Sequence, residues 1–342
     1  MTNKTIKPSA SGRALACASV FALGVTLTGC LATTGGQPAT QYGAFGVPQG
    51  EITTVGIDYL KGEQKVVIGS FRVAFSQKVS ASARSSSLFG TDSQSAGMSG
   101  TLTGLDNAQY QAIADTAYAD FVKKLKTTGL QVIEPQALQQ SELYKQMASS
   151  PSPLLMGDQV MVAPTGMKLA IFPGEAGVSS AFGGFDTTNP MRVFPQLAKE
   201  QSAGVMSVTY YVDFLNASTS GNTRILGGDA EVSMGQGLSV RAGSGIDYST
   251  LKGVQCVGYC PNAVSSIDLG QAVYSTEPYG VSRDVTAGGV NTLGIMSGLL
   301  TGSGFSRKDI EITADPARYQ KISEQLLEST NTKLVDAVQK AR

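Results

Sequence analysis

Four consecutive segments in the first half of the chain leave few possible folds. Residues 65–75 read KVVIGSFRVAF and are rich in β-branched and aromatic side chains, which predicts a buried strand. Residues 76–107 are rich in Ser, Gly and Ala and predict a long excursion. Residues 108–128 carry apolar side chains at helical spacing before Gly129, which predicts a helix, and residues 130–133 predict a second strand. This order indicates an α/β (α+β) fold, a single mixed-sheet domain with flanking helices.

The end of the chain predicts a further helix. Asp315 has the position of an N-cap and Pro316 that of the first turn, and apolar residues recur on one face over residues 319–338. A helix packed on the sheet is the simpler interpretation, and a coiled coil is the alternative, because only three to four loose heptads fit. We expect this C-terminal amphipathic helix to follow a final strand.

The N-terminus has the form of an export signal. It carries Lys4, Lys7 and Arg13 without an acidic residue, and an apolar run follows over residues 14–26. That run is shorter than the ~20 residues of a membrane-spanning helix. The next residues, LTGC, end at Cys30 and resemble the bacterial lipobox. An ordinary signal peptide with a chance cysteine is the alternative.

The lipobox resemblance implies a lipid anchor. Cys30 becomes the N-terminus of the processed chain and carries fatty acyl chains of the palmitate type. Leu31 stands where an aspartate would retain a lipoprotein at the inner membrane, so the resemblance implies an outer-membrane protein that faces the periplasm. Outer-membrane lipid is then its first partner.

The chain divides into segments with different expected roles. The signal peptide (residues 1–29) is followed by the lipidated N-terminus and tether (30–62). The periplasmic domain (63–305) comes next and has two long Gly/Ser-rich insertions, residues 76–107 and 243–305. The final strand and helix are residues 306–342.

Two cysteines remain in the processed domain, Cys256 and Cys260. An oxidising compartment favours a disulfide between such close thiols. A zinc site needs about four ligands, and no histidine or further cysteine completes one. The bridge closes a very short loop, so we expect it to shape a loop tip and to stabilise little. Two unpaired thiols are the alternative.

Composition lowers the expectation of an enzyme. The 342 residues include no histidine, which removes the commonest general base and metal ligand. The 26 basic and 26 acidic residues cancel, so no basic footprint for nucleic acid is present. Asp229 and Glu231 share one face of an expected strand, and a solvated face explains them better than acid–base chemistry. We expect no catalytic residue, metal or cofactor.

Part of the sequence resembles a known family. The pieces KVVIGSFRVAF and AYADFVKKLKTTGLQVIEP, with Gly129, Val132, Ile133 and Glu134 in the pattern G-x-x-V-hydrophobic-E, resemble the periplasmic domain of curli-type secretion lipoproteins, the CsgG family, and of smaller relatives such as PelC. Residues 197–204, LAKEQSAG, resemble the helix before that family's next strand. The similarity covers about a third of the chain, and residues 243–305 have no counterpart.

The resemblance implies rings of subunits at the outer membrane, with two amphipathic hairpins per subunit that form a shared β-barrel. A first candidate hairpin alternates over residues 71–84, with a slip at Gln77, and returns through residues 98–105. A second candidate begins near Asp229 and carries the tip with Cys256 and Cys260. The first face is rich in Ala and Ser, which is weak for lipid contact and favours a periplasmic loop.

Three functions remain open from the sequence. The leading expectation is a non-catalytic outer-membrane lipoprotein, homo-oligomeric or bound to envelope proteins, that serves as a structural component of an envelope or secretion complex. The alternative is a periplasmic lipoprotein that binds a ligand or glycan. A hydrolase that uses carboxylates alone is the third.

Overall fold

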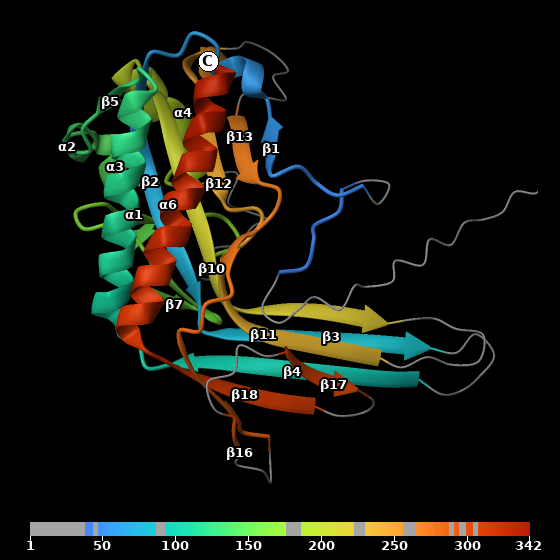
Figure 1. The fold of residues 1–342 in the computed structure, drawn as a ribbon. Coiled ribbons are helices and arrows are strands. Elements are labelled where there is room, and N and C mark those ends of the chain that lie inside the picture. Colours follow the sequence, from blue (N-terminus) through green and yellow to red (C-terminus); the bar gives the residue numbers. More distant parts are fainter. Residues whose placement is uncertain are drawn as a thin grey trace, which may run out of the picture.

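The fold is described from a computed structural model. It describes residues 38–43, 47–86, 93–175, 186–221, 230–255, 264–286, 291–293, 299–303 and 307–342. Two long helices, α1 (Asn107–Thr127) and α6 (Pro316–Ala341), lie side by side on one face of a large sheet. Two long pairs of strands project from this body in one direction (Figure 1).

The remaining helices are shorter and include one 3-10 turn. They are η2 (Ile57–Leu60), α2 (Gln136–Gln139), α3 (Glu142–Gln146), α4 (Pro190–Gln201) and α5 (Leu251–Gln255).

Most described strands belong to one large mixed sheet. Its main path runs in the order β1-β13-β12-β10-β2-β8-β7, with β5 on β2, with β11 on β10, and with β14 and β17 on β11. Those strands are β1 (Ile52–Val55), β2 (Lys65–Ser76), β5 (Gln131–Ile133), β7 (Leu154–Met156), β8 (Gln159–Val162), β10 (Gly204–Gly221), β11 (Ala230–Val240), β12 (Gly245–Ser249), β13 (Val264–Leu269), β14 (Val273–Ser275) and β17 (Leu299–Ser303).

A second sheet has the order β16-β15-β18-β4-β3, and a small pair joins β6 to β9. Their bounds are β3 (Lys78–Ser86), β4 (Ser93–Thr103), β15 (Gly280–Asp284), β16 (Asn291–Leu293), β18 (Arg307–Ala314), β6 (Ser149–Ser150) and β9 (Leu169–Ala170). Together with the helices these sheets confirm the predicted α/β (α+β) class.

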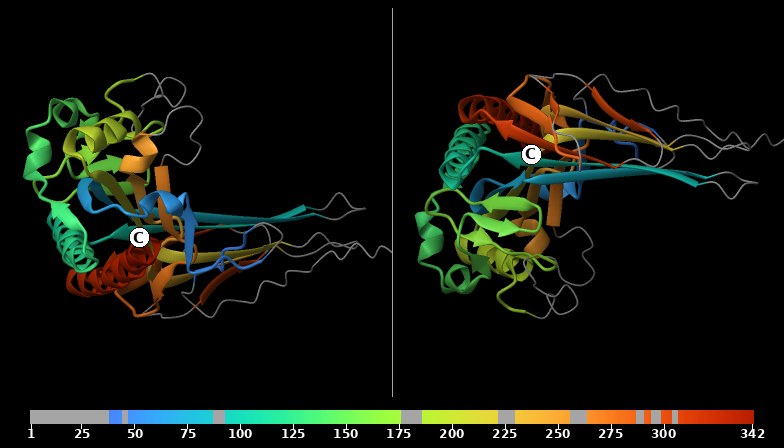
Figure 2. Two further views of the ribbon diagram at one scale, coloured as in Figure 1. Left: turned by 90° about the horizontal axis from the view of Figure 1, so that it is seen from above. Right: turned by 90° about the horizontal axis from the view of Figure 1, so that it is seen from below.

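The core lies on both faces of β2, since every residue from the second to the last is buried. On one face Phe71 packs on Phe121 of α1 and Tyr210 of β10, with ring centroids 5.8 and 5.4 Å away. On the other face Val67 and Val205 pack with α4. Figure 2 shows α1 and α6 on one side of the sheet and α4 on the other. A strand that is covered on both faces explains why the sequence is mostly apolar here and does not alternate between apolar and polar residues.

The two best-marked helices form as predicted. Asp106 caps α1 in a capping box with Gln109, and Gly129 adopts a φ of 83° just after the helix ends. Asp315 caps α6, and its carboxylate accepts a hydrogen bond from the Arg318 amide at 3.1 Å. The local sequence determines both ends because capping groups act within one turn.

Several expectations are wrong in detail. The sequence of residues 135–148 is compatible with one helix, but the structure has two short helices there, α2 and α3, and the Ser141 side chain caps the second. The excursion over residues 76–107 contains the paired strands β3 and β4, and residues 243–305 contain described strands from β12 to β17. The second hairpin does not start near Asp229, since β11 returns from the preceding strand β10.

Candidate functional site

The α/β body carries two long β-hairpins, β3–β4 and β10–β11, which project from it. Strands β3 and β4 pair from Lys78↔Thr101 to Ser86↔Ser93, so a hairpin forms in the first candidate region. Its bounds differ from the expected ones, because residues 71–76 belong to β2 of the main sheet and the return strand covers residues 93–103. Strands β10 and β11 pair from Val212↔Val240 to Gly221↔Ala230. Figure 2 shows from above and below that both hairpins leave the body together.

Each hairpin leaves the body at an irregularity in its strand. Gln77, where the sequence slips, separates β2 from β3, and its backbone amide donates to the Asp158 carbonyl at 2.7 Å. Strand β10 shifts register between Asp213 and Leu215. The Ser76 hydroxyl donates to the Asp213 carboxylate at 2.6 Å, so a side-chain hydrogen bond joins the two bends. Bulges of this kind redirect a strand and increase its twist.

The inner faces of the hairpins pack on each other. Small or flexible side chains fill the space: Ala83, Ala96 and Met98 from the first hairpin and Met234 and Leu238 from the second are all buried in the main core cluster. Small residues allow the two layers to approach closely. The apolar face of the first hairpin is therefore covered by the second in this structure.

Gly100 marks a close approach between the two layers. A Cβ atom there would lie 2.0 Å from Leu215 Cδ1, whereas one at Gly97 on the same strand would find its nearest neighbour, the Ala81 carbonyl oxygen, at 3.9 Å. Gly100→Ala should lower the free energy of unfolding by about 1–3 kcal/mol relative to Gly97→Ala, because the buried Leu215 must move. Urea unfolding of both variants measures this difference, and equal stabilities would contradict the tight packing.

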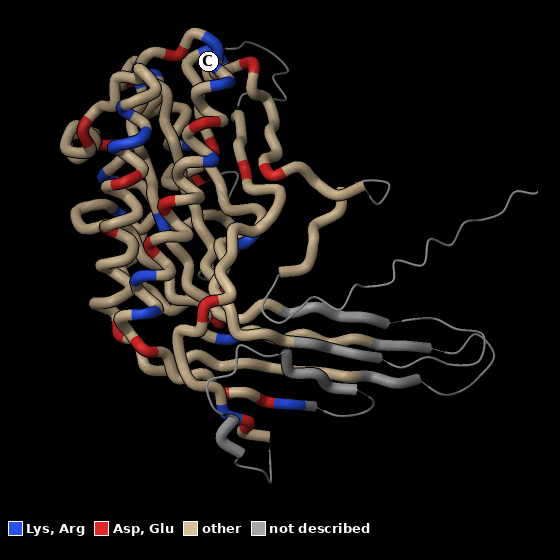
Figure 3. The backbone as a smooth tube through the Cα atoms, viewed as in Figure 1, with Lys and Arg blue, Asp and Glu red and all other residues tan. Residues whose placement is uncertain are grey.

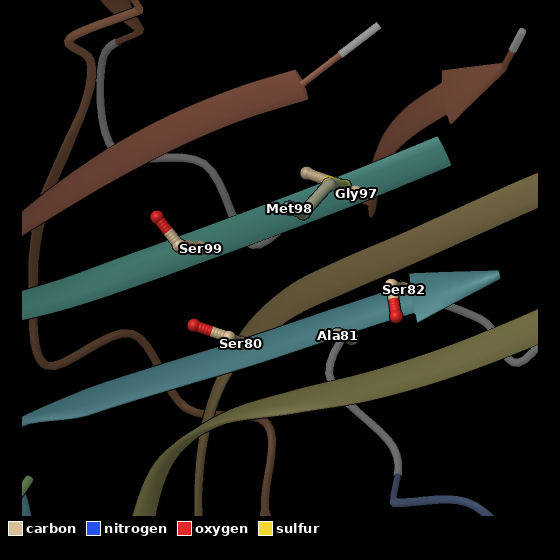
Figure 4. A pocket seen from close by; sticks show the side chains of 6 residues that line it. All are labelled: Ser80, Ala81, Ser82, Gly97, Met98 and Ser99. Carbon is tan, nitrogen blue, oxygen red and sulfur yellow. The ribbon is translucent and has the colours of Figure 1, made fainter. Parts of the chain in front are cut away.

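The outer face of the first hairpin is polar. Ser80, Ser82 and Ser99 line a surface hollow of about 330 Å³ between β3 and β4, and Figure 4 shows Ser80 and Ser99 pointing to the same side. The Ser99 hydroxyl donates to the Asp309 carboxylate at 2.5 Å. Figure 3 shows the described hairpin strands near the body almost free of charge, while both signs alternate on the helices.

Both hairpins also present open strand edges. Among the described residues, β3 pairs with β4 alone, and β10 beyond Val212 pairs with β11 alone. An open edge exposes backbone N–H and C=O groups that can pair with another chain. A long open edge is therefore a surface suited to assembly.

The site residues expected from the sequence lie outside the described part of the chain. This holds for the expected acylation site Cys30, for the expected disulfide partners Cys256 and Cys260, and for Asp229. Glu231 lies on β11.

The described residues hold no group of three or more His, Cys, Asp or Glu side chains that could bind a metal. No helix in the described ranges has the length and hydropathy to cross a membrane.

A second polar region lies on the opposite face of the main sheet from α1 and α6. Arg72 is 5% exposed in mid-sheet, and its guanidinium pairs with the Glu175 carboxylate at 2.6 Å. It also donates to Thr209 Oγ1 at 2.9 Å and to the Ala170 carbonyl at 3.3 Å, and stacks on Phe172 with 4.4 Å to the ring centroid. The pair therefore fastens the segment around residue 172 to the sheet.

Two aspartates lie on the same face of β12 and β13. Burial and the nearby Asp247 raise the pKa of Asp268 to about 6, although the Ser266 hydroxyl donates to it. The Asp247 side chain reaches solvent, but the protein atoms crowded around it raise its pKa by desolvation, against the effect of Arg72. Sequence reasoning missed this cluster, because Arg72, Asp247 and Asp268 are far apart in the chain. Arg72, a charge inside an apolar strand, was the one local signal.

Comparison with known proteins adds no relative. Neither a protein family, nor a curated protein, nor a solved structure matches this chain.

Proposed function

We propose that this chain is a non-catalytic, outer-membrane lipoprotein that assembles with copies of itself as a structural part of an envelope or secretion complex. The observation that carries the proposal is the pair of hairpins, which project together and keep open edges on β3 and on β10 beyond Val212. The export signal and the lipobox-like LTGC at Cys30 support the location. The resemblance to curli-type secretion lipoproteins implies the same kind of assembly.

The packing of the hairpins supports assembly over ligand binding. A binding protein needs a concave pocket with converging polar groups. The hollow beside Ser80 and Ser99 opens on the hairpin surface, and the interior between the hairpins is filled by side chains. Edge pairing between copies would supply hydrogen-bond partners for the open backbone groups. A head-to-tail contact of this kind forms a closed ring when the rotation from one subunit to the next is a whole fraction of a full turn.

The mass of the acylated protein in mild detergent tests the proposal. We expect light scattering to report a fixed multiple of the monomer mass over a wide concentration range. Ser82→Glu places a charge beside the open edge, and it should reduce the mass to that of a monomer while the melting temperature stays the same, because Ser82 is exposed.

Cys30→Ser tests the lipid anchor. This variant should abolish labelling of the protein by a fatty acid, because the thiol that would carry the acyl chain is absent.

Thr332→Glu is the matched control, since it adds the same charge at an exposed position of α6. It should leave the mass unchanged. A monomer at all concentrations would contradict assembly, assembly that survives Ser82→Glu would contradict the hairpin edge as the interface, and persistent labelling of Cys30→Ser would contradict the anchor.

A further inference from the structure

The polar face of the main sheet brings three oxygen-bearing side chains together. Ser207 of β10 lies directly opposite Asp247 of β12, and Asp268 of β13 lies directly opposite Gly245 of β12. Asp247 and Asp268 are therefore diagonal neighbours on one face, at a typical Cα separation of ~7–8 Å, within reach of a shared ligand.

The backbone at Gly245 makes room for one of the two carboxylates. A Cβ atom at this position would lie 2.2 Å from Asp268 Oδ1. The carboxylate of Asp268 thus crosses over β12, and any larger residue at 245 would displace it. Packing of this kind holds Asp268 beside Asp247 despite their repulsion.

The charges of the cluster do not cancel. Arg72 is the nearby cation, but it already pairs with Glu175 at 2.6 Å. The charges of Arg72 and Glu175 cancel each other. When Asp247 and Asp268 are both ionised, two negative charges therefore remain. The raised pKa values mean that ionisation of both aspartates costs folding free energy at neutral pH, because an unfolded chain ionises them at their ordinary pKa.

Ser207 supplies an independent sign of a missing partner. Its side chain is 3% exposed, and its hydroxyl forms no hydrogen bond within the described residues. A buried hydroxyl without a hydrogen-bond partner destabilises the folded state. Its register places Ser207 directly beside Asp247, on the face of the sheet that also carries Asp268.

We propose that the Asp247 and Asp268 carboxylates, with the Ser207 hydroxyl, bind a hard divalent cation of the Ca²⁺ and Mg²⁺ class. These ligands are all oxygen atoms, which hard cations prefer, and waters complete the coordination when only two carboxylates are supplied. The two positive charges balance the two negative charges of the cluster. The site is separate from the hairpins and does not depend on the proposed assembly.

Isothermal titration of the acylated, EDTA-treated full-length mature protein with CaCl₂, and separately with MgCl₂, tests the proposal. We expect one saturable site per chain with a Kd of about 10⁻⁴–10⁻³ M for at least one of the two ions, as in weak sites with few charged ligands. Asp268→Asn should weaken binding about tenfold or more, because it removes one of two ligand charges. Without cation, it should also raise the melting temperature, because it removes the repulsion.

Asp58→Asn is the matched control, because Asp58 is an exposed acid that pairs with Lys61 on the surface. It should bind the cation as the unchanged protein does. No saturable heat below about 10 mM of either ion, or equal affinity in the Asp247→Asn/Asp268→Asn variant, would overturn the proposal. Circular dichroism of each variant shows that a lost signal is not lost folding.

Discussion

Arg72→Ala should lower the free energy of unfolding by about 3–5 kcal/mol. The guanidinium is buried in mid-sheet and pairs with Glu175 at 2.6 Å, so its removal leaves a largely buried carboxylate without its partner. It also removes the hydrogen bonds to Thr209 and the Ala170 carbonyl and the stacking on Phe172. Urea unfolding followed by circular dichroism measures the loss.

A second variant separates the orphaned charge from the lost packing. Adding Glu175→Gln to Arg72→Ala should recover part of the loss, because no charge is then left without a partner. Lys61→Ala, which removes an exposed ion pair with Asp58, should leave the unfolding midpoint unchanged. If Arg72→Ala and Lys61→Ala behave alike, the buried pair does not hold the segment around residue 172.

Asn331→Leu should lower the free energy of unfolding by about 3 kcal/mol. Asn331 lies on α6, and its fully buried side chain contacts α1 and β10. Its amide nitrogen donates to the Ala117 carbonyl at 2.9 Å and to the Asp120 carboxylate at 2.8 Å, and its oxygen accepts from the Tyr210 hydroxyl at 2.7 Å. Leucine leaves these groups without their partner.

The double variant Asn331→Leu/Tyr210→Phe isolates the orphaned hydroxyl. It should be more stable than Asn331→Leu, because replacing both partners by apolar groups avoids a buried polar group without a hydrogen bond. Thr332→Ala on the exposed side of the same helix should change stability by less than about 0.5 kcal/mol. Thermal and urea unfolding compare the four proteins, and equal losses in the single and double variants would show that the hydroxyl finds another acceptor.

Local signals predicted the elements whose ends depend on nearby residues. The helix α1 ends before Gly129 and α6 begins at Asp315 and Pro316, as predicted, and the structure adds Asp106 as the cap of α1. Capping and apolar spacing act within a few residues, so one sequence is enough to locate them. The strand over residues 65–75 was equally clear, because a strand buried on both faces is a continuous apolar run.

The hairpins could be predicted only in part. The alternation over residues 78–83 and the slip at Gln77 marked the first hairpin, but its Ala and Ser content resembled a loop. The tertiary structure makes Ala83 and Ala96 part of a buried face, because β10 and β11 cover them. For the second hairpin, β10 extends to Gly221, beyond the apolar part of its sequence.

Residues that are neighbours in the chain predict an export signal, and they were enough to predict the C-terminal end of α1, the start of α6 and the α/β class. The tertiary structure alone decided which faces are buried and which distant charges meet. Arg72 finds Glu175, Asp247 finds Asp268 and Asn331 finds Tyr210 only after the sheet and its helices have formed. Contacts of this kind join residues tens to hundreds of positions apart, and no local pattern records which partner the fold will supply.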